Sequence, residues 1–111
     1  MSRARERRPD YLRAVRALPC IAGRLWGGCD GPIEAHHAGK NPGMGMKATD
    51  ETAVPLCQRH HRHITGIVGG YGEFRHLSVE ERRKLQDIWV RDTQRTLSDV
   101  LTGKARPDDA Y

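Results

Sequence analysis

Residues 52–66, TAVPLCQRHHRHITG, combine a strand pattern, a helix pattern and an unusual concentration of cysteine and histidine. Within seven positions the segment carries Cys57, His60, His61 and His63. TAVPL favours a strand, in which Pro55 indicates an edge position or a strand end. QRHHRHIT favours a short helix that ends at Gly66. The chain has only three cysteines and six histidines in total, so this clustering indicates metal ligands, a catalytic site, or both.

The length and composition of the chain limit the size of the domain and of its hydrophobic core. The 111 residues suffice for one small domain, and 37% apolar residues with a single Phe make a thin core. Domains of this kind often need a bound metal or a disulfide to fold. Three cysteines cannot all pair, the charged N-terminus lacks a secretory signal, and no run approaches the roughly 20 apolar residues that span a membrane. We therefore expect a cytoplasmic protein with reduced, metal-binding thiols and no membrane contact.

The charge balance favours a nucleic acid as partner. Lysine and arginine together number 19 against 14 acidic residues, which gives a net charge of +5. Arginine is the commoner base, and its guanidinium group matches the geometry of phosphate. An ordinary basic surface is the alternative explanation of the same charge.

Composition and patterning divide the chain into four segments. The N-terminal residues are basic and offer no apolar group to fold around, so we expect a flexible arm. A core preceded by a short helix comes next, then a longer helix that packs on the core, and then a tail. In order, these predicted segments are residues 1–9, 10–76, 77–102 and 103–111.

Local signals predict the elements within these segments. Asp10 is the expected N-cap of the short helix, which ends at Pro19. The long helix begins with a capping box, in which Ser78 and Glu81 each bond the other's backbone. Between the two helices, turns, a strand and a loop are predicted for residues 20–32, 33–37 (IEAHH) and 38–51.

All three cysteines and one histidine have the chemistry of a structural zinc site. Cys57 and His60 are separated by two residues, the spacing at which a chain turns back to present two ligands to one ion. Cys20 and Cys29 lie in a glycine-rich stretch that can bend as the ion requires, although their eight-residue separation is looser than usual. The alternative is that each cysteine is only a small buried side chain. A zinc site would offset the thin core.

The adjacent histidines His36 and His37 point to a second kind of chemistry. Neighbouring side chains of a strand face opposite sides, so the two imidazoles cannot do the same job. Hydrolysis of a phosphodiester needs a base that takes a proton from water and a cation that holds charge on the leaving oxygen. Imidazoles can serve as that base and as ligands of that cation.

Taken together, the pattern C…C…IEAHHAG…GMGMKATDETAVPLCQRHHRHITG resembles the HNH, or ββα-metal, nuclease superfamily. It is most similar to phage and prophage members, including the recombination-enhancement (Ref-like) nucleases, over about residues 19–66. The resemblance implies an α+β fold with a small zinc-stabilised ββα-metal (HNH, treble-clef-like) core and flanking N- and C-terminal helices. It also implies a phage- or prophage-encoded endonuclease that hydrolyses DNA in the cytoplasm of a bacterial host cell.

The resemblance also implies roles for individual residues. His37 matches the general base, and Asp50 lies near the residue that orients it. His36 and His61 match the ligands of a catalytic divalent cation, which Mg²⁺, Mn²⁺, Ni²⁺ or Zn²⁺ could fill. The structural zinc ligands of many members match Cys20, Cys29, Cys57 and His60.

One departure from the family pattern concerns the helix after the second strand. Phage-type relatives often carry a further histidine four residues after the metal ligand, where this chain has Thr65, and His63 appears instead. On a helix Thr65 would face the ion and His63 would face away, which favours a phosphate contact or a surface position for His63 over a role as ligand. The candidate nucleic-acid contacts are Lys47, Arg59, Arg62 and His63.

A non-catalytic zinc module that binds nucleic acid or serves in an assembly is the competing hypothesis. Such a module has no use for a second imidazole beside His36, outside the zinc ligands, so the pair favours the enzyme. The expected partners of the enzyme are DNA and, as directing proteins, a recombinase or a phage packaging or replication protein.

Overall fold

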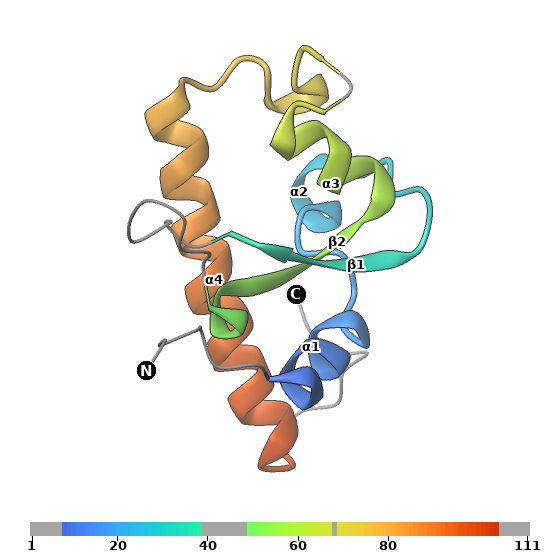
Figure 1. Ribbon diagram of the computed structural model, residues 1–111, viewed down its shortest axis with the longest axis vertical. Helices are drawn as coiled ribbons and strands as arrows, with labels where there is room; N and C mark the ends of the chain where they lie inside the picture. The colour runs from blue at the N-terminus through green and yellow to red at the C-terminus, as the bar shows by residue number, and fades with distance from the viewer. Residues whose placement is uncertain (1–7, 39–48, 68, 105–111) are drawn as a thin grey trace, which may run out of the picture.

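The computed structural model describes residues 8–38, 49–67 and 69–104. Most of the predicted arm and the loop that holds Lys47 lie outside these ranges. The described chain is a small α+β fold of two strands and several helices (Figure 1). Its elements, in order, are α1 (Pro9–Arg16), α2 (Gly23–Trp26), β1 (Ile33–His37), the 3-10 helix η1 (Asp50–Thr52), β2 (Ala53–Cys57), α3 (Gln58–Thr65), the 3-10 helix η2 (Gly72–Phe74) and α4 (Val79–Leu101).

The two strands form one antiparallel sheet. Ile33 of β1 is opposite Cys57 of β2, and His37 is opposite Ala53. Every residue of β2 is buried, including Pro55 in its middle. Proline has no N–H to donate, but its carbonyl accepts a hydrogen bond from the Ile21 N–H at 2.9 Å. The sequence prediction of both strands is confirmed, with β2 shifted by one residue toward the C-terminus.

The short helix α3 begins and ends as its sequence predicts. Cys57 is the N-cap, and its Sγ accepts a hydrogen bond from the His60 N–H. Gly66 closes the helix in the left-handed conformation with φ of 74°, a backbone state that glycine adopts without steric cost. The strand β2 therefore passes directly into a helix that starts at a candidate metal ligand.

The N-terminal part differs from the sequence prediction in two ways. Helix α1 has Arg8 as its N-cap and Pro9 in its first turn, so the prediction of Asp10 as N-cap is wrong. Proline suits the first helical position because its φ is already helical, and the Asp10 carboxylate instead accepts a hydrogen bond from Arg13. The stretch predicted as turns contains the one-turn helix α2.

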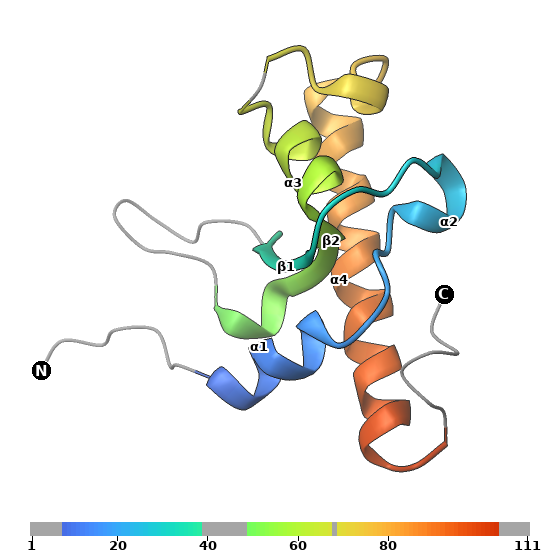
Figure 2. The same ribbon diagram turned by 90° about the vertical axis from the view of Figure 1, so that its right-hand side faces the viewer.

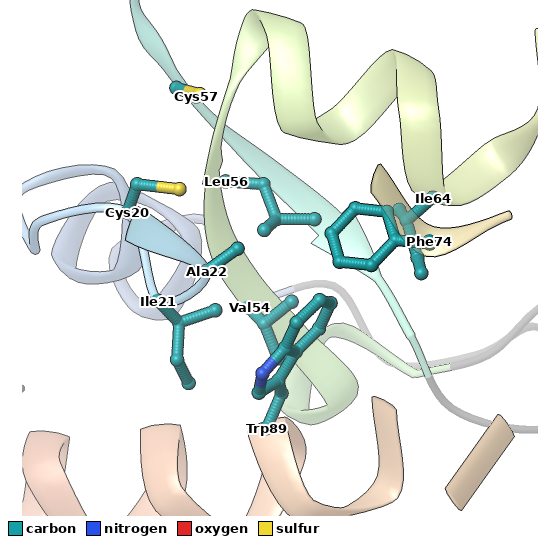
Figure 3. Packing of buried hydrophobic residues seen from close by; sticks show 9 residues of the cluster. All are labelled: Cys20, Ile21, Ala22, Val54, Leu56, Cys57, Ile64, Phe74 and Trp89. Atoms are coloured by element: carbon teal, nitrogen blue, oxygen red, sulfur yellow. The ribbon is translucent and has the colours of Figure 1, made fainter. Parts of the chain in front are cut away.

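Two groups of buried side chains hold the elements together. The larger, here called the aromatic cluster, comprises Cys20, Ile21, Ala22, Val54, Leu56, Cys57, Ile64, Phe74 and Trp89 (Figure 3). Within it the rings of Phe74 and Trp89 meet edge to face at 5.9 Å between centroids. The smaller, the α1 cluster, comprises Val15, Leu18, Ala53 and Leu97. Because β2 contributes to both, the sheet joins them.

Helix α4 runs along the molecule past the sheet and past α1 (Figures 1 and 2). It contributes Trp89 to the aromatic cluster and Leu97 to the α1 cluster. The predicted capping box is confirmed: Ser78 Oγ accepts from the Glu81 N–H, and Glu81 Oε1 accepts from the Ser78 N–H. Of the helices described, none has the length and apolar character needed to cross a membrane.

Candidate metal centre and histidine pair

Four side chains from distant parts of the sequence converge at the edge of the aromatic cluster, to which Cys20 and Cys57 themselves belong. Cys20 follows α1, Cys29 follows α2, and Cys57 and His60 lie where β2 meets α3. Their Sγ and Nδ1 atoms all lie within 4.8 Å of one another. The predicted grouping of Cys20, Cys29, Cys57 and His60 is therefore confirmed.

The spacing of these atoms fits a tetrahedral zinc ion. From His60 Nδ1, the Sγ atoms of Cys57, Cys20 and Cys29 lie at 3.1, 3.4 and 3.8 Å. Zinc bonds of about 2.3 Å to sulfur and 2.0 Å to nitrogen separate the ligands of a tetrahedron by roughly 3.5 Å. Three thiolates and one imidazole are also a standard closed zinc set. The residues present therefore fit a structural zinc ion.

The electrostatics of the cluster call for a cation. Although Cys29 is exposed, partial desolvation of its thiol, together with the nearby Cys20 and Cys57, raises its pKa to about 12. Burial likewise raises the pKa of Cys20 and lowers that of His60. Neutral imidazole is the form that binds a metal, whereas the thiols must lose their protons. A divalent cation reverses the repulsion among the thiolates, so metal binding and thiol ionisation are coupled.

The Glu73 carboxylate supports this centre from η2. Its Oε2 accepts from Nε2 of His60 at 3.1 Å and from Arg59 at 2.8 Å, and its Oε1 accepts from Nδ1 of His63 at 2.5 Å. Burial raises the pKa of Glu73, but its backbone hydrogen bond, the His63 hydrogen bond and the charges of His60 and Arg59 outweigh burial and lower it overall. A carboxylate on the second nitrogen of a metal-binding imidazole fixes the ring and strengthens the ligand.

The same carboxylate changes the interpretation of two candidate DNA contacts. Arg59 donates to Glu73 and to the Gly28 carbonyl, and the His63 ring packs so close to Gly72 that an added Cβ would lie 2.3 Å from it. Arg59 and His63 thus have partners inside the protein. Arg62 is exposed and borders two hollows of about 390 and 200 Å³, the second of which also includes His61.

The second histidine group lies where β1, α3 and α4 meet. The rings of His36 and His61 are 4.9 Å apart between centroids and tilted by 55°. Nε2 of His36 donates to Gln86 Oε1 at 2.8 Å, and Nδ1 of His61 donates to Glu34 Oε1 at 2.7 Å. Burial lowers the pKa of His36 to about 4, so this imidazole is neutral at physiological pH and has a lone pair for an ion.

His37 has different partners from His36, as strand alternation predicts. Nε2 of His37 donates to Asp50 Oδ1 at 2.9 Å. The Asp50 side chain is buried, at 1% exposure, while that of His37 is 32% exposed. The Arg8 N–H donates to Asp50 Oδ2 at 2.6 Å, so both carboxylate oxygens have a donor. The hydrogen bond therefore ties the Nε2 edge of a partly exposed imidazole to a buried carboxylate.

Several contacts at this site have little or no sequence signature. Gln86 lies in a helix outside the motif, and Glu73 lies in a stretch that reads as irregular. Glu34 could have been found, because it precedes His36 by two residues and so shares its face of the strand. The Thr65 hydroxyl donates to the carbonyls of His61 and Arg62 within α3, and its expected orientation toward the ion stays a prediction.

A family model described as "Recombination enhancement, RecA-dependent nuclease" matches residues 3–82. The match extends beyond residues 19–66, on which the motif resemblance rests, and includes most of the basic arm and the start of α4. No solved structure matches the chain.

Proposed function

Because the chain belongs to the family of recombination-enhancement, RecA-dependent nucleases, we propose that it is a divalent-metal-dependent HNH endonuclease that hydrolyses DNA phosphodiester bonds. The proposal includes a phage or prophage origin and a ββα-metal core formed by β1, β2 and α3. Family membership makes the chain a nuclease. The HNH class and the assignment of the residues rest on the histidine geometry.

The observation that carries the proposal is the approach of His36 to His61. Two imidazoles bound to one ion at about 2.1 Å, with a ligand–metal–ligand angle between square and tetrahedral, have centroids roughly 4.5–5.2 Å apart. The measured 4.9 Å falls within that range. Strand β1 and helix α3 bring together two side chains that are 25 positions apart in the sequence. Two protein ligands leave room for water and phosphate oxygens.

The residues present therefore suit a catalytic divalent cation held by His36 and His61. When bound, such an ion supplies positive charge to the scissile phosphate and to the oxygen that leaves. Mg²⁺, Mn²⁺, Ni²⁺ and Zn²⁺ are the candidates, and two imidazoles favour the transition metals more than carboxylates would. The hollow of about 200 Å³ beside His61 is bordered by Arg62, whose guanidinium can contact a phosphate group, and by Glu34, whose carboxylate is paired with His61.

His37 is the proposed general base. Its Nε2–H is committed to Asp50, so Nδ1 carries the lone pair that takes a proton from water. The water oxygen then bonds to phosphorus as the bond from phosphorus to the 3′ oxygen breaks, and the departing 3′ oxygen takes a proton from solvent water, which leaves a 5′-phosphate and a 3′-hydroxyl. Asp50 acts as a positioning residue, because it fixes the ring and the tautomer of His37 without touching the substrate.

The zinc centre has a structural role in this proposal. His60 is a zinc ligand, and the next residue along α3 is His61. A zinc ion bound to the N-terminal turn of α3 therefore holds that turn, and with it His61, against β1. The zinc ion also substitutes for part of the hydrophobic core that so small a domain cannot supply.

The partners follow from charge and from the family. We propose that DNA is the substrate, that Arg62 and Lys47 contact its phosphates, and that a recombinase directs the nuclease in the cytoplasm of a bacterial cell. Arg59 and His63 support the zinc centre through Glu73.

Cleavage and metal content test the proposal together. The purified chain is expected to nick supercoiled plasmid with at least one of the four ions, and to hold one tight zinc and one exchangeable ion. His36→Ala and His61→Ala should lose the exchangeable ion and the cleavage but keep the zinc. His76→Ala, at an exposed histidine outside both sites, is the control. A single tight zinc, with no cleavage under any ion, would favour the non-catalytic zinc module.

A further inference from the structure

We propose that Gln86 and Glu34 are positioning residues that select the ring nitrogens with which His36 and His61 bind the catalytic ion. The nitrogens so selected are Nδ1 of His36 and Nε2 of His61. The inference rests on the proposed function, because it takes these two histidines as ligands of that ion. It adds helix α4 to the active site, although α4 lies outside the sequence motif.

The orientation of the Gln86 amide is fixed by its own helix. Nε2 of Gln86 donates to the Arg82 carbonyl at 3.3 Å, and a carbonyl can only accept. The amide oxygen must therefore face His36, where the separation from Nε2 is 2.8 Å. Since an amide oxygen also only accepts, Nε2 of His36 carries the hydrogen. The lone pair of the neutral ring is then on Nδ1.

Glu34 fixes the other tautomer in its partner, His61. The carboxylate has no hydrogen to give, and its Oε1 lies 2.7 Å from Nδ1 of His61. Nδ1 of His61 therefore carries the hydrogen, and the lone pair is on Nε2. Glu34 and His36 lie on the same face of β1, so one strand supplies both a ligand and the acceptor that orients the other ligand.

The Gln86 and Glu34 acceptors fix the tautomers of His36 and His61 before an ion binds. Without them each ring would exchange between tautomers, and only a fraction of molecules would present both lone pairs together. Each acceptor also makes its imidazole a stronger ligand, as acceptors on the second nitrogen of metal-bound histidines do. The ring centroids of His36 and His61 are 4.9 Å apart, a separation compatible with two ligands of one ion.

Titration of the zinc-loaded chain with Mn²⁺, followed by calorimetry, tests the role of Gln86. Gln86→Met keeps the length of the side chain and removes the strong acceptor, and should weaken Mn²⁺ binding about 10–100-fold. Gln86→Glu keeps an acceptor and should retain most of the affinity. Gln94→Met is the matched control, because Gln94 lies on the same helix and donates to the Glu51 carbonyl instead.

The outcomes separate the inference from the function on which it rests. If the parent chain binds Mn²⁺ and Gln86→Met binds it equally well, the positioning role is wrong while the function stands. If mutation of His36 and His61 leaves Mn²⁺ binding unchanged, the proposed catalytic site is wrong and the inference fails with it.

Nuclear magnetic resonance of the imidazole nitrogens provides a second measurement on the unaltered protein. In the zinc-loaded chain without a second ion, we expect a hydrogen on Nε2 of His36 and on Nδ1 of His61. The second is the less common tautomer of histidine, so it does not arise by default. A spectrum with the hydrogen on Nε2 of His61 would overturn the assignment, whatever the cleavage activity.

Discussion

Replacement of Asp50 by Asn should abolish most of the activity while it leaves the shape of the side chain almost unchanged. Asp50 Oδ2 accepts from the Arg8 N–H at 2.6 Å, and Oδ1 accepts from Nε2 of His37 at 2.9 Å. An asparagine has only one acceptor oxygen. Because the Arg8 N–H can only donate, that oxygen must face Arg8, and the NH₂ group must face His37.

The consequence for His37 is a change of tautomer. Nε2 must then accept from the asparagine NH₂, so the ring hydrogen moves to Nδ1. Nδ1 is the atom that the proposed mechanism uses as the base, and it can no longer take a proton from water. General-base catalysis contributes about 10²–10⁴-fold to a rate, and the loss in kcat should fall in that range. Loss of the charged hydrogen bond should also cost about 1–3 kcal/mol of folding free energy.

Single-turnover nicking of supercoiled plasmid, at a saturating concentration of the active ion, measures the effect. Glu51→Gln is the control, since Glu51 is the neighbouring carboxylate and its side chain pairs with Arg8 at the surface. In the double variant Asp50→Asn, His37→Ala the rate should equal that of His37→Ala alone, because both changes remove one base. Losses that multiply in the double variant, or an Asp50→Asn protein as fast as the parent, would refute the reasoning.

Four further predictions concern the base, the zinc centre and the long helix. His37→Ala should retain its zinc and its fold and lose divalent-dependent nicking, and a variant that nicks like the parent would exclude this residue as the base. Cys57→Ala, or removal of zinc by a chelator, should unfold the chain, because a structural zinc ion supplies on the order of 10 kcal/mol of folding free energy. A cooperative thermal transition in circular dichroism after either change would contradict this. Folding lowers the pKa of Glu73 below its ordinary value of 4.5, so the ionised carboxylate stabilises the fold above pH 4.5 and this stabilisation is lost as the pH falls through the folded pKa. In urea unfolding, the stability difference between the parent and Glu73→Gln should therefore shrink as the solution is acidified. Ser78→Ala should cost about 0.5–2 kcal/mol in thermal or urea unfolding through loss of the helix cap, whereas Ser98→Ala, at an exposed position within α4, should change little.

The elements that local chemistry determines were predictable from the sequence. The strand IEAHH, the helix that ends at Gly66, and the capping box at Ser78 each follow from residues within a few positions of one another. The four-residue metal cluster was also predictable, because a chain of this size has few other uses for three cysteines. The start of α1 was not, since proline at the first helical position prevailed over Asp10 as a cap.

Contacts between distant segments were the part that the sequence did not reveal. Glu73 contacts His60 from 13 positions away in the sequence, and Gln86 contacts His36 from 50 positions away. Neither a glutamate nor a glutamine predicts such a partner from the sequence. The ion pair between Arg59 and the half-buried Glu73 was not predicted for the same reason, and the role of Arg59 as a DNA contact stays a prediction. Tertiary packing, which brings η2 and α4 to the motif, determines these pairings.

The path of α4 sets a limit on how far this polypeptide could be shortened for use as a portable DNA-cutting module. A fragment that stops at Gly66 would contain every residue of the recognisable motif. It would still lack Trp89 and Leu97, which complete the aromatic cluster and the α1 cluster, and it would lack the Gln86 amide that hydrogen-bonds to His36. Fusion of this nuclease to another targeting protein therefore requires the chain through at least Leu101, with the junction placed beyond that residue.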